Sequence, residues 1–256
     1  MSSHPPAGPP HTRVALVTVA DTGLGRAVAR LLAEAGVTVY AGVRSDAAGR
    51  ATERELRASG LDVRHTRLDL DDDTTVTRAA ELVQRGGGRL DALVNMVGLT
   101  ASLGGAADGS DRELRAMFET NLLDALHLMT VTGAMFPLLR RSGGRVVNVA
   151  GAFEAPARTG AAAPRNAVEA LTLRYALMGR PDGVLVNAVC VEAGVPGWDG
   201  FEEDGALRRA AALPVRLALA EDLLLTATST GPDGVCVQLS ADGPGDAQGT
   251  ATIRVV

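Results

Sequence analysis

The sequence predicts an α/β fold in which helices cover both faces of a single parallel sheet of about seven strands. Short apolar runs typical of buried strands alternate with segments of helical periodicity from residue 14 onward. Alternation of this kind builds a parallel sheet through right-handed crossovers. With 256 residues, of which 46% are hydrophobic and 21% charged, the chain is long enough to bury one large core.

Glycines and one proline mark the ends of several elements. The first helix opens at residues 23–25 and ends near Gly36, and the third is stopped by glycines at 86–88. The long fourth helix carries Pro137 in its last turns. Strands are expected at residues 14–19, 37–43, 61–70, 90–95, 145–150, 183–190 and 234–239, and helices at 23–36, 47–59, 73–85, 111–141, 164–178 and 217–228.

The chain is expected to form one domain over residues 13–240. Residues 1–12 form a Pro-rich tail predicted to be disordered, and this tail lacks the basic-then-apolar order of a signal peptide. Residues 241–256 form an extension that the pattern does not place, although residues 252–256 suit an edge strand. Because no apolar run approaches 18 residues, we expect a cytoplasmic protein.

Charge and residue composition exclude several classes of function. The net charge is −5, and all 25 basic residues are arginines interleaved with acids, which indicates neither a nucleic acid nor a membrane partner. Cys190 and Cys236 each lie in an apolar run, and the four histidines lack ligand spacing, so neither a disulfide framework nor a metal site is expected. A small soluble ligand is the expected partner.

An ordered series of segments resembles the short-chain dehydrogenase/reductase family. The segments are Thr18 followed by Gly23-Leu24-Gly25, Asp69-Leu70, Leu93-Val94-Asn95 with Gly98, Asn121 within residues 119–122, and residues 144–149, 167–172 and 186–189. The series spans residues 14 to about 240. The resemblance implies a Rossmann-type doubly wound sheet, with a nucleotide across the carboxyl ends of the strands where the strand order reverses.

The resemblance also assigns the nucleotide contacts. Phosphates would lie at the start of the first helix, where backbone N–H groups and the helix dipole favour anions. Arg44 stands just after the second strand, where an arginine suits the 2′-phosphate of NADP(H). The phosphate contacts assigned in this way are Gly23, Leu24 and Gly25, with Arg44 at the 2′-phosphate. Asp69 and Leu70 would flank the adenine, and Asn95 and Gly98 would line the floor of the site.

The phosphate loop departs from the family pattern at two positions. Val19 replaces a glycine, and its β-branched side chain is expected to resist a positive φ and a close backbone approach. Asp21 adds negative charge where a pyrophosphate would bind. We therefore expect weakened NADP(H) affinity, the alternative being a reshaped loop that still binds.

The catalytic set of the family is missing. The chain has no lysine, and its tyrosines are Tyr40 and Tyr175. Alignment on residues 167–172 puts Arg165 at the lysine position and Ala161 at the tyrosine position, and only Asn121 of the family's set remains. Since arginine does not act as a tunable base, ordinary ketone reduction is disfavoured.

Other polar residues arrive where the family's site would lie. Glu154 follows the fifth strand, Glu192 follows the sixth, and Arg165 opens the helix between them, so that these residues and Asn121 are expected to share one pocket. Two carboxylates with pKa values pushed apart would perform acid/base chemistry without a cofactor or metal. The alternative is a solvated loop residue for each glutamate and a helix-start salt bridge for Arg165.

Aromatic residues in the same two loops suggest the substrate. Phe153, Trp198 and Phe201 offer flat apolar surface suited to a hydrophobic, polyketide-like molecule, the alternative being that they only pack on the scaffold.

Three hypotheses follow. The first is a cyclase, dehydratase or isomerase of bacterial secondary metabolism, the second a noncatalytic partner of an active homologue, and the third a divergent NADP(H)-dependent ketoreductase. The resemblance also implies a homodimer or homotetramer formed through the helices at 111–141 and 164–178, or a hetero-oligomer with an active family member.

Overall fold

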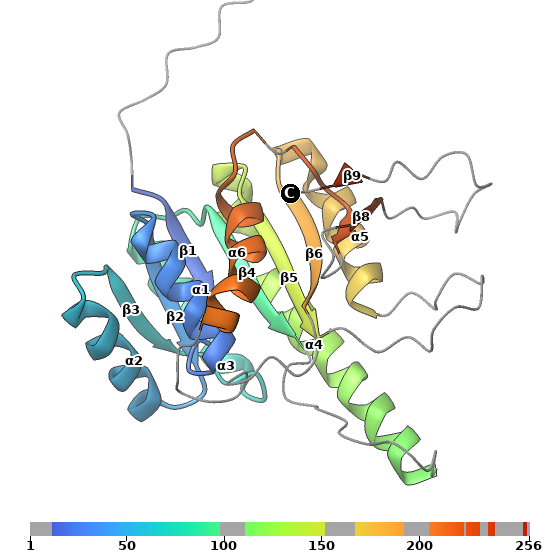
Figure 1. The fold of residues 1–256 in the computed structure, drawn as a ribbon, viewed down its shortest axis with the longest axis horizontal. Helices are drawn as coiled ribbons and strands as arrows, with labels where there is room; N and C mark the ends of the chain where they lie inside the picture. The colour runs from blue at the N-terminus through green and yellow to red at the C-terminus, as the bar shows by residue number, and fades with distance from the viewer. Residues whose placement is uncertain are drawn as a thin grey trace, which may run out of the picture.

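The protein folds around a single sheet, seen here in a computed structural model that describes residues 12–97, 111–151, 167–191, 205–222, 224–230, 235–238 and 253–254. Within these ranges nine strands pair in the order β3-β2-β1-β4-β5-β6-β7-β8-β9 (Figure 1). The strands are β1 (Val14–Val17), β2 (Thr38–Val43), β3 (Val63–Arg67), β4 (Ala92–Val97), β5 (Arg145–Gly151), β6 (Leu185–Val191), β7 (Thr228–Thr230), β8 (Val235–Gln238) and β9 (Ile253–Arg254). Strands β1 to β7 are parallel, which confirms the predicted seven-stranded parallel sheet, and β8 and β9 extend it in antiparallel pairing.

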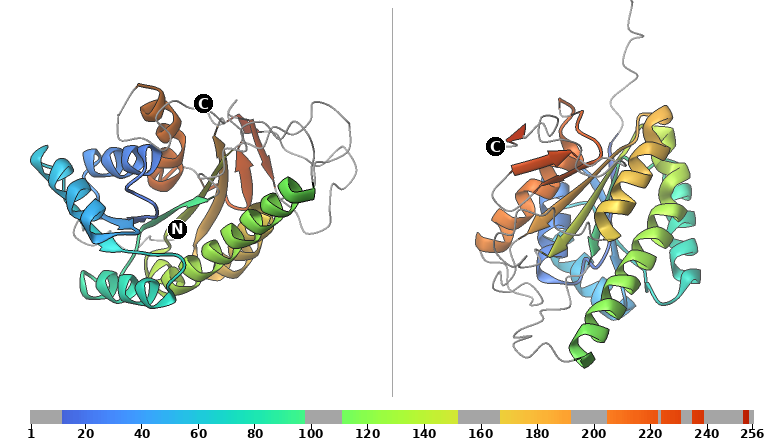
Figure 2. Two further views of the ribbon diagram at one scale, coloured as in Figure 1. Left: turned by 90° about the horizontal axis from the view of Figure 1, so that it is seen from below. Right: turned by 90° about the vertical axis from the view of Figure 1, so that its right-hand side faces the viewer.

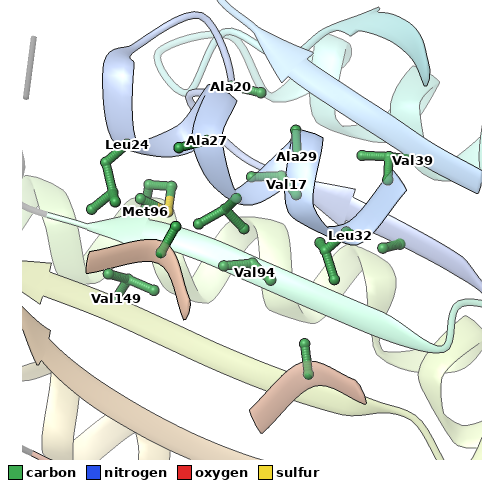
Figure 3. Packing of buried hydrophobic residues seen from close by; sticks show 14 of the residues in the cluster. Val17, Ala20, Leu24, Ala27, Ala29, Leu32, Val39, Val94, Met96 and Val149 are labelled. Carbon is green, nitrogen blue, oxygen red and sulfur yellow. The ribbon is translucent and has the colours of Figure 1, made fainter. Parts of the chain in front are cut away.

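Helices cover both faces of the sheet, as the sequence predicts (Figure 2). They are α1 (Gly23–Glu34), α2 (Asp46–Ala58), α3 (Asp73–Arg85), α4 (Asp111–Ser142), α5 (Ala167–Gly179) and α6 (Gly205–Leu219). Apolar residues of α1, α2 and α6 pack on one face and those of α3, α4 and α5 on the other, so the core has two halves. In the first half, Leu24 and Leu32 of α1 pack with Val94 of β4 (Figure 3). In the described part of the chain, the helices fall short of the length and apolarity that crossing a lipid bilayer requires.

The strand order reverses between β1 and β4. The chain runs from β1 outward through β2 to β3 and then returns to place β4 on the other side of β1. The two crossovers therefore leave in opposite directions and open a crevice at the carboxyl ends of β1 and β4. Thr18, directly after β1, links the two strands at this crevice, because its Oγ1 accepts the N–H of Met96 in β4 at 2.8 Å.

The prediction for residues 217–239 is wrong for the helix, whereas the expected strand at 234–239 overlaps β8. The expected helix at 217–228 is absent: α6 ends at Leu219, and residues 228–230 form β7 beside β6. The expected seventh parallel strand at 234–239 is β8, which pairs with β7 in the antiparallel direction. The largely apolar run at 223–227 is compatible with a helix. However, the edge of β6 has backbone N–H and C=O groups that need partners, and residues 228–230 pair with them only in an extended conformation.

A chain of buried polar side chains links the central strands to the helices behind them. The Nδ2 atom of Asn95 in β4 donates to Asn148 Oδ1 in β5 at 2.9 Å and to Thr132 Oγ1 in α4 at 3.0 Å. Asn148 Nδ2 in turn donates to Thr172 Oγ1 in α5 at 2.9 Å. Because buried polar groups are costly unless bonded, this chain fixes how α4 and α5 seat on the sheet.

Tyr175 is a structural residue between α4 and α5. Its side chain is 6% exposed, its hydroxyl donates to the Met129 carbonyl at 3.0 Å, and its ring lies 5.5 Å from that of Phe136. Burial raises the pKa of the Tyr175 phenol. The hydroxyl is therefore committed to holding the two helices together.

Replacing Tyr175 by Phe removes this hydrogen bond and keeps the ring contact. We expect the free energy of unfolding to fall by about 1 kcal/mol, which lowers Tm by roughly 2–4 °C in calorimetry. A Phe136→Leu variant, which loses the ring contact and keeps the hydroxyl, separates the two contributions. An unchanged Tm for Tyr175→Phe would contradict the assigned role.

Candidate functional site

The turn between β1 and α1 presents unpaired backbone donors. Thr22 caps the helix: its Oγ1 donates to the Val19 carbonyl at 2.9 Å and accepts the Gly25 N–H at 3.4 Å. Among the described residues, the N–H groups of Gly23 and Leu24 have no acceptor. Free N–H groups at a helix start, together with the helix dipole, suit an anion such as a phosphate.

Gly25 is required by the closeness of this turn. A Cβ atom at Gly25 would lie 2.2 Å from the Val19 carbonyl oxygen, far inside van der Waals contact. Any larger residue would have to move either the turn or the start of α1. The turn is also held from the other side, because the Ala20 N–H donates to the Gly42 carbonyl of β2 at 2.9 Å.

Val19 adopts the left-handed conformation that its side chain disfavours. Its φ is +50°, so the turn holds valine in a conformation that a β-branched side chain resists. The conformation costs of order 1–3 kcal/mol for a residue other than glycine. Packing of the partly buried Val19 side chain on the core under α1 offsets part of this cost.

The ends of β2 and β3 carry the other predicted nucleotide contacts. Arg44 is exposed directly after β2, and among the described residues it has no hydrogen-bond or ion-pair partner. Asp69 is fixed after β3 because its N–H donates to Thr75 Oγ1 at 2.9 Å and its carbonyl accepts from the same hydroxyl at 2.9 Å. The Asp21 side chain is partly exposed in the β1–α1 turn. The predicted residues thus lie along one edge of the sheet.

A small hollow lies at this edge between β1, β4 and α4. Its lining residues are Thr18, Leu70, Asn95, Met96, His127, Leu128 and Val131. Asn95 is 2% exposed, and its Oδ1 has no partner among the described residues, so one buried acceptor remains available beside the hollow. The site thus joins two predicted residues, Leu70 and Asn95, to side chains of α4.

His127 is a site residue that sequence reasoning missed. Its Nε2 lies 3.4 Å from Asp71 Oδ1, which ties α4 to the segment after Leu70. The sequence indicated no site role for His127, because the four histidines lack the spacing of metal ligands. Its approach to Leu70 depends on how α4 packs over the sheet, and no local pattern reports that packing.

Several predicted residues are not placed. The residues outside the described ranges are Gly98, Phe153, Glu154, Arg165, Glu192, Trp198 and Phe201. Asn121 lies within α4, but the structure does not describe its side chain. The predicted acid/base group and the aromatic contacts therefore remain predictions. Among the described residues, no group of three or more side chains is arranged to hold a metal ion.

Comparison with known proteins establishes the family. The model of the short chain dehydrogenase family matches residues 13–194. The chain belongs to this family. A crystal structure of a short chain dehydrogenase from Mycobacterium smegmatis is 25% identical, with a TM-score of 0.65 over 86% of this chain and 91% of that chain. A variant of the actinorhodin polyketide ketoreductase, crystallised with NADPH, shares the fold at 24% identity and a TM-score of 0.65 over 86% of this chain and 95% of that one.

Curated relatives of this chain are named as reductases and dehydrogenases. One is named as a ketoacyl reductase of the monensin polyketide synthase from Streptomyces virginiae, 35% identical over 70% of this chain and 69% of the relative. Another is an L-fucose dehydrogenase from Oryctolagus cuniculus, 32% identical over 73% of this chain and 64% of the relative. These names contradict the non-redox hypothesis of a cyclase, dehydratase or isomerase, which rested on residues missing from the catalytic set.

A Val19→Gly variant tests the strain in the β1–α1 turn. Glycine adopts φ +50° without the steric cost, and this gain exceeds its added entropy in the unfolded chain, about 0.5–1 kcal/mol. We expect Tm to rise by a few degrees in a thermal melt. Val17→Gly, in the neighbouring extended strand, is the matched control and is expected to lower Tm. A lower Tm for Val19→Gly would show that valine packing outweighs the strain.

Proposed function

We propose that this short chain dehydrogenase is a divergent NADP(H)-dependent reductase of a ketone. The observation that carries the proposal is the β1–α1 turn, which keeps its close backbone approach at Gly25 and its unpaired N–H groups even though Val19 must adopt a positive φ. Strain of this kind persists where the surrounding structure holds it and is common at functional sites. The names of the curated relatives support the same activity.

The described residues fit the parts of NADP(H) in turn. The N–H groups of Gly23 and Leu24 at the start of α1 would hold the pyrophosphate, and Arg44 would pair with the 2′-phosphate. Asp69 and Leu70, which follow β3, would flank the adenine, and Asn95 would lie on the floor of the site. When bound, the cofactor supplies the hydride that reduces a carbonyl carbon.

Proton delivery distinguishes this chain from a standard family member. The sequence contains no lysine, and the Tyr175 hydroxyl is bonded to the Met129 carbonyl. We therefore propose that the phenol and amine pair of the family is absent and that water protonates the reduced oxygen. Loss of a positioned acid costs about 10²–10⁴-fold in rate, so turnover would be slow. An arginine at position 165 would stay charged and could hold a carbonyl oxygen without donating its proton.

The proposed substrate is a small hydrophobic ketone of the ketoacyl type. The name of the Streptomyces virginiae relative supports this class. The predicted contacts Phe153, Trp198 and Phe201 would provide its apolar surroundings.

Nucleotide binding and turnover together test the proposal. NADPH is added to the purified protein and its fluorescence recorded, and oxidation of NADPH at 340 nm is then followed with 1-tetralone or a β-ketoacyl thioester. We expect binding and slow oxidation that depends on the ketone. Absence of NADPH binding, or binding without reduction of either substrate, would overturn the proposed activity.

An Arg44→Gln variant tests cofactor choice. Losing a charge-assisted contact with the 2′-phosphate is expected to raise the Kd for NADPH about tenfold, whereas the Kd for NADH, which lacks that group, should not change. Arg54→Gln, on the exposed side of α2, is the matched control. An equal rise in the Kd values for NADPH and NADH would show that Arg44 does not bind the 2′-phosphate.

We also propose that the protein is a homo-oligomer formed through α4 and α5, which lie side by side (Figure 2). Large apolar side chains on these helices are exposed to solvent, namely Leu123, Leu126, Met129, Leu177 and Met178. Leu177 and Met178 also line a shallow apolar depression on α5 with Leu173. Exposed apolar surface that runs across two neighbouring helices suits a second copy of the same chain.

A double Leu126→Arg and Leu177→Arg variant tests this interface. Because two copies would place the added charges against apolar surface, we expect a smaller oligomer, ending at the monomer, in light scattering after gel filtration. Leu224→Arg is the control, since Leu224 is 78% exposed and lies outside both helices. An unchanged mass for the double variant would rule out this surface.

A further inference from the structure

Helix α2 starts directly behind Arg44, so its seat on the sheet sets the position of this arginine. Arg44 follows the last residue of β2 and precedes Ser45, which caps α2. The Ser45 Oγ accepts the Ala48 N–H at 3.3 Å and so fixes the first turn of the helix. Because consecutive Cα atoms are held about 3.8 Å apart, a shift of α2 moves the backbone at Arg44 with it.

The first turn of α2 packs closely on the strand end that carries Arg44. Gly49 is buried, and a Cβ atom there would lie 2.7 Å from Val43 Cγ2 and 2.6 Å from Cδ2 of His65 in β3. Val43 is the residue before Arg44. The helix therefore cannot approach the sheet any further, and the freedom that remains to it is to move outward.

Apolar packing holds α2 less firmly than α1. Helix α2 buries Gly49, Thr52 and Leu56, of which Leu56 alone is a large apolar residue. Helix α1 buries most of its length, including Leu24 and Leu32. Since a helix is docked mainly by the apolar area that it buries, α2 depends more than α1 on polar contacts for its position.

Two acids supply polar contacts on opposite sides of α2. Glu53 and Glu55 are two residues apart, which on a helix separates their directions by about 200°. Glu53 accepts the backbone N–H of His65 in β3 at 3.1 Å and also pairs with the His65 ring. Glu55 reaches α1 instead, where it pairs with Arg26 at 3.2 Å and with Arg30 at 3.1 Å. The helix is thus held between β3 and α1.

These pairs are more sheltered than ordinary surface salt bridges. The Arg26 side chain is 4% exposed, and Glu53 and His65 are half-buried, so solvent screens their charges less. Burial raises the pKa of Glu53, but hydrogen bonds from His65 and Arg57 outweigh it, and the pKa lies below its ordinary value. The Glu53 carboxylate therefore stays charged in its contact with β3.

We propose that Glu53 and Glu55 are positioning residues for the choice of cofactor. By holding α2 against β3 and α1, they keep Arg44 where it meets the 2′-phosphate of NADPH. The inference rests on the proposed function, and it goes further because it assigns the preference for NADPH to two acids that act through Arg44 without touching the nucleotide. NADH lacks the 2′-phosphate, so its binding does not depend on them.

The Kd values of NADPH and NADH, measured by nucleotide fluorescence, test the proposal in Glu53→Gln and Glu55→Gln. Because a loosened α2 displaces Arg44 without removing it, we expect the Kd for NADPH to rise about threefold and that for NADH to stay constant. A change in the ratio of the two Kd values in either variant supports the proposal. Glu81→Gln, which removes an exposed acid that pairs with Arg85 in α3, is the control and should leave both values unchanged. An unchanged ratio in both variants would overturn it.

A double variant shows whether the acids act through Arg44. Residues that act through one contact have effects that do not add, so Glu55→Gln should leave the Kd for NADPH unchanged in a protein that already carries Arg44→Gln. A further rise there would show an effect independent of Arg44 and would overturn the proposal. Failure of the proposed function gives a different result: the unsubstituted protein would then bind no NADPH, whereas failure of this inference alone leaves NADPH binding intact and the ratio of Kd values constant.

Discussion

The contact between the Val19 carbonyl and Gly25 is the constraint on which the site depends. The two backbone segments approach so closely that a Cβ atom at position 25 would lie 2.2 Å from the Val19 oxygen, so only glycine fits there. The left-handed backbone at Val19 directs that carbonyl toward α1, where Thr22 binds it and starts the helix. The same turn continues from Thr18, whose hydroxyl accepts the Met96 N–H, so the crevice between β1 and β4 is positioned by the same few residues.

Elements with strong local signals were predicted well. The helix at 73–85 has the bounds of α3, because Asp72 caps its start and glycine ends it. The helix expected at 217–228 was wrong, because the short and largely apolar run at 223–227 fits a helix or a strand equally well. There the outcome depends on the open edge of β6, which no local pattern reveals.

The candidate site divides in the same way. Gly23, Arg44 and Leu70 were assigned from the family resemblance, and the segments after β1, β2 and β3 bring them to one end of the parallel sheet. His127 was missed because it reaches the hollow from α4 and lies more than fifty residues after Leu70 in the chain. The non-redox hypothesis failed for a different reason. That hypothesis was drawn from residues expected in the family and not found in the sequence, whereas the relatives are named as reductases and dehydrogenases.

The hydrogen bond between the side chains of Asn95 and Asn148 affects the register in which β4 and β5 pair. Asn95 and Asn148 stand opposite each other in the β4 and β5 ladder, and both face α4 and α5. Sliding one strand by a single residue would turn its amide toward the apolar layer beneath α1 and α6, stranded without hydrogen bonds. These two asparagines therefore penalise a shift of β4 against β5 by one residue.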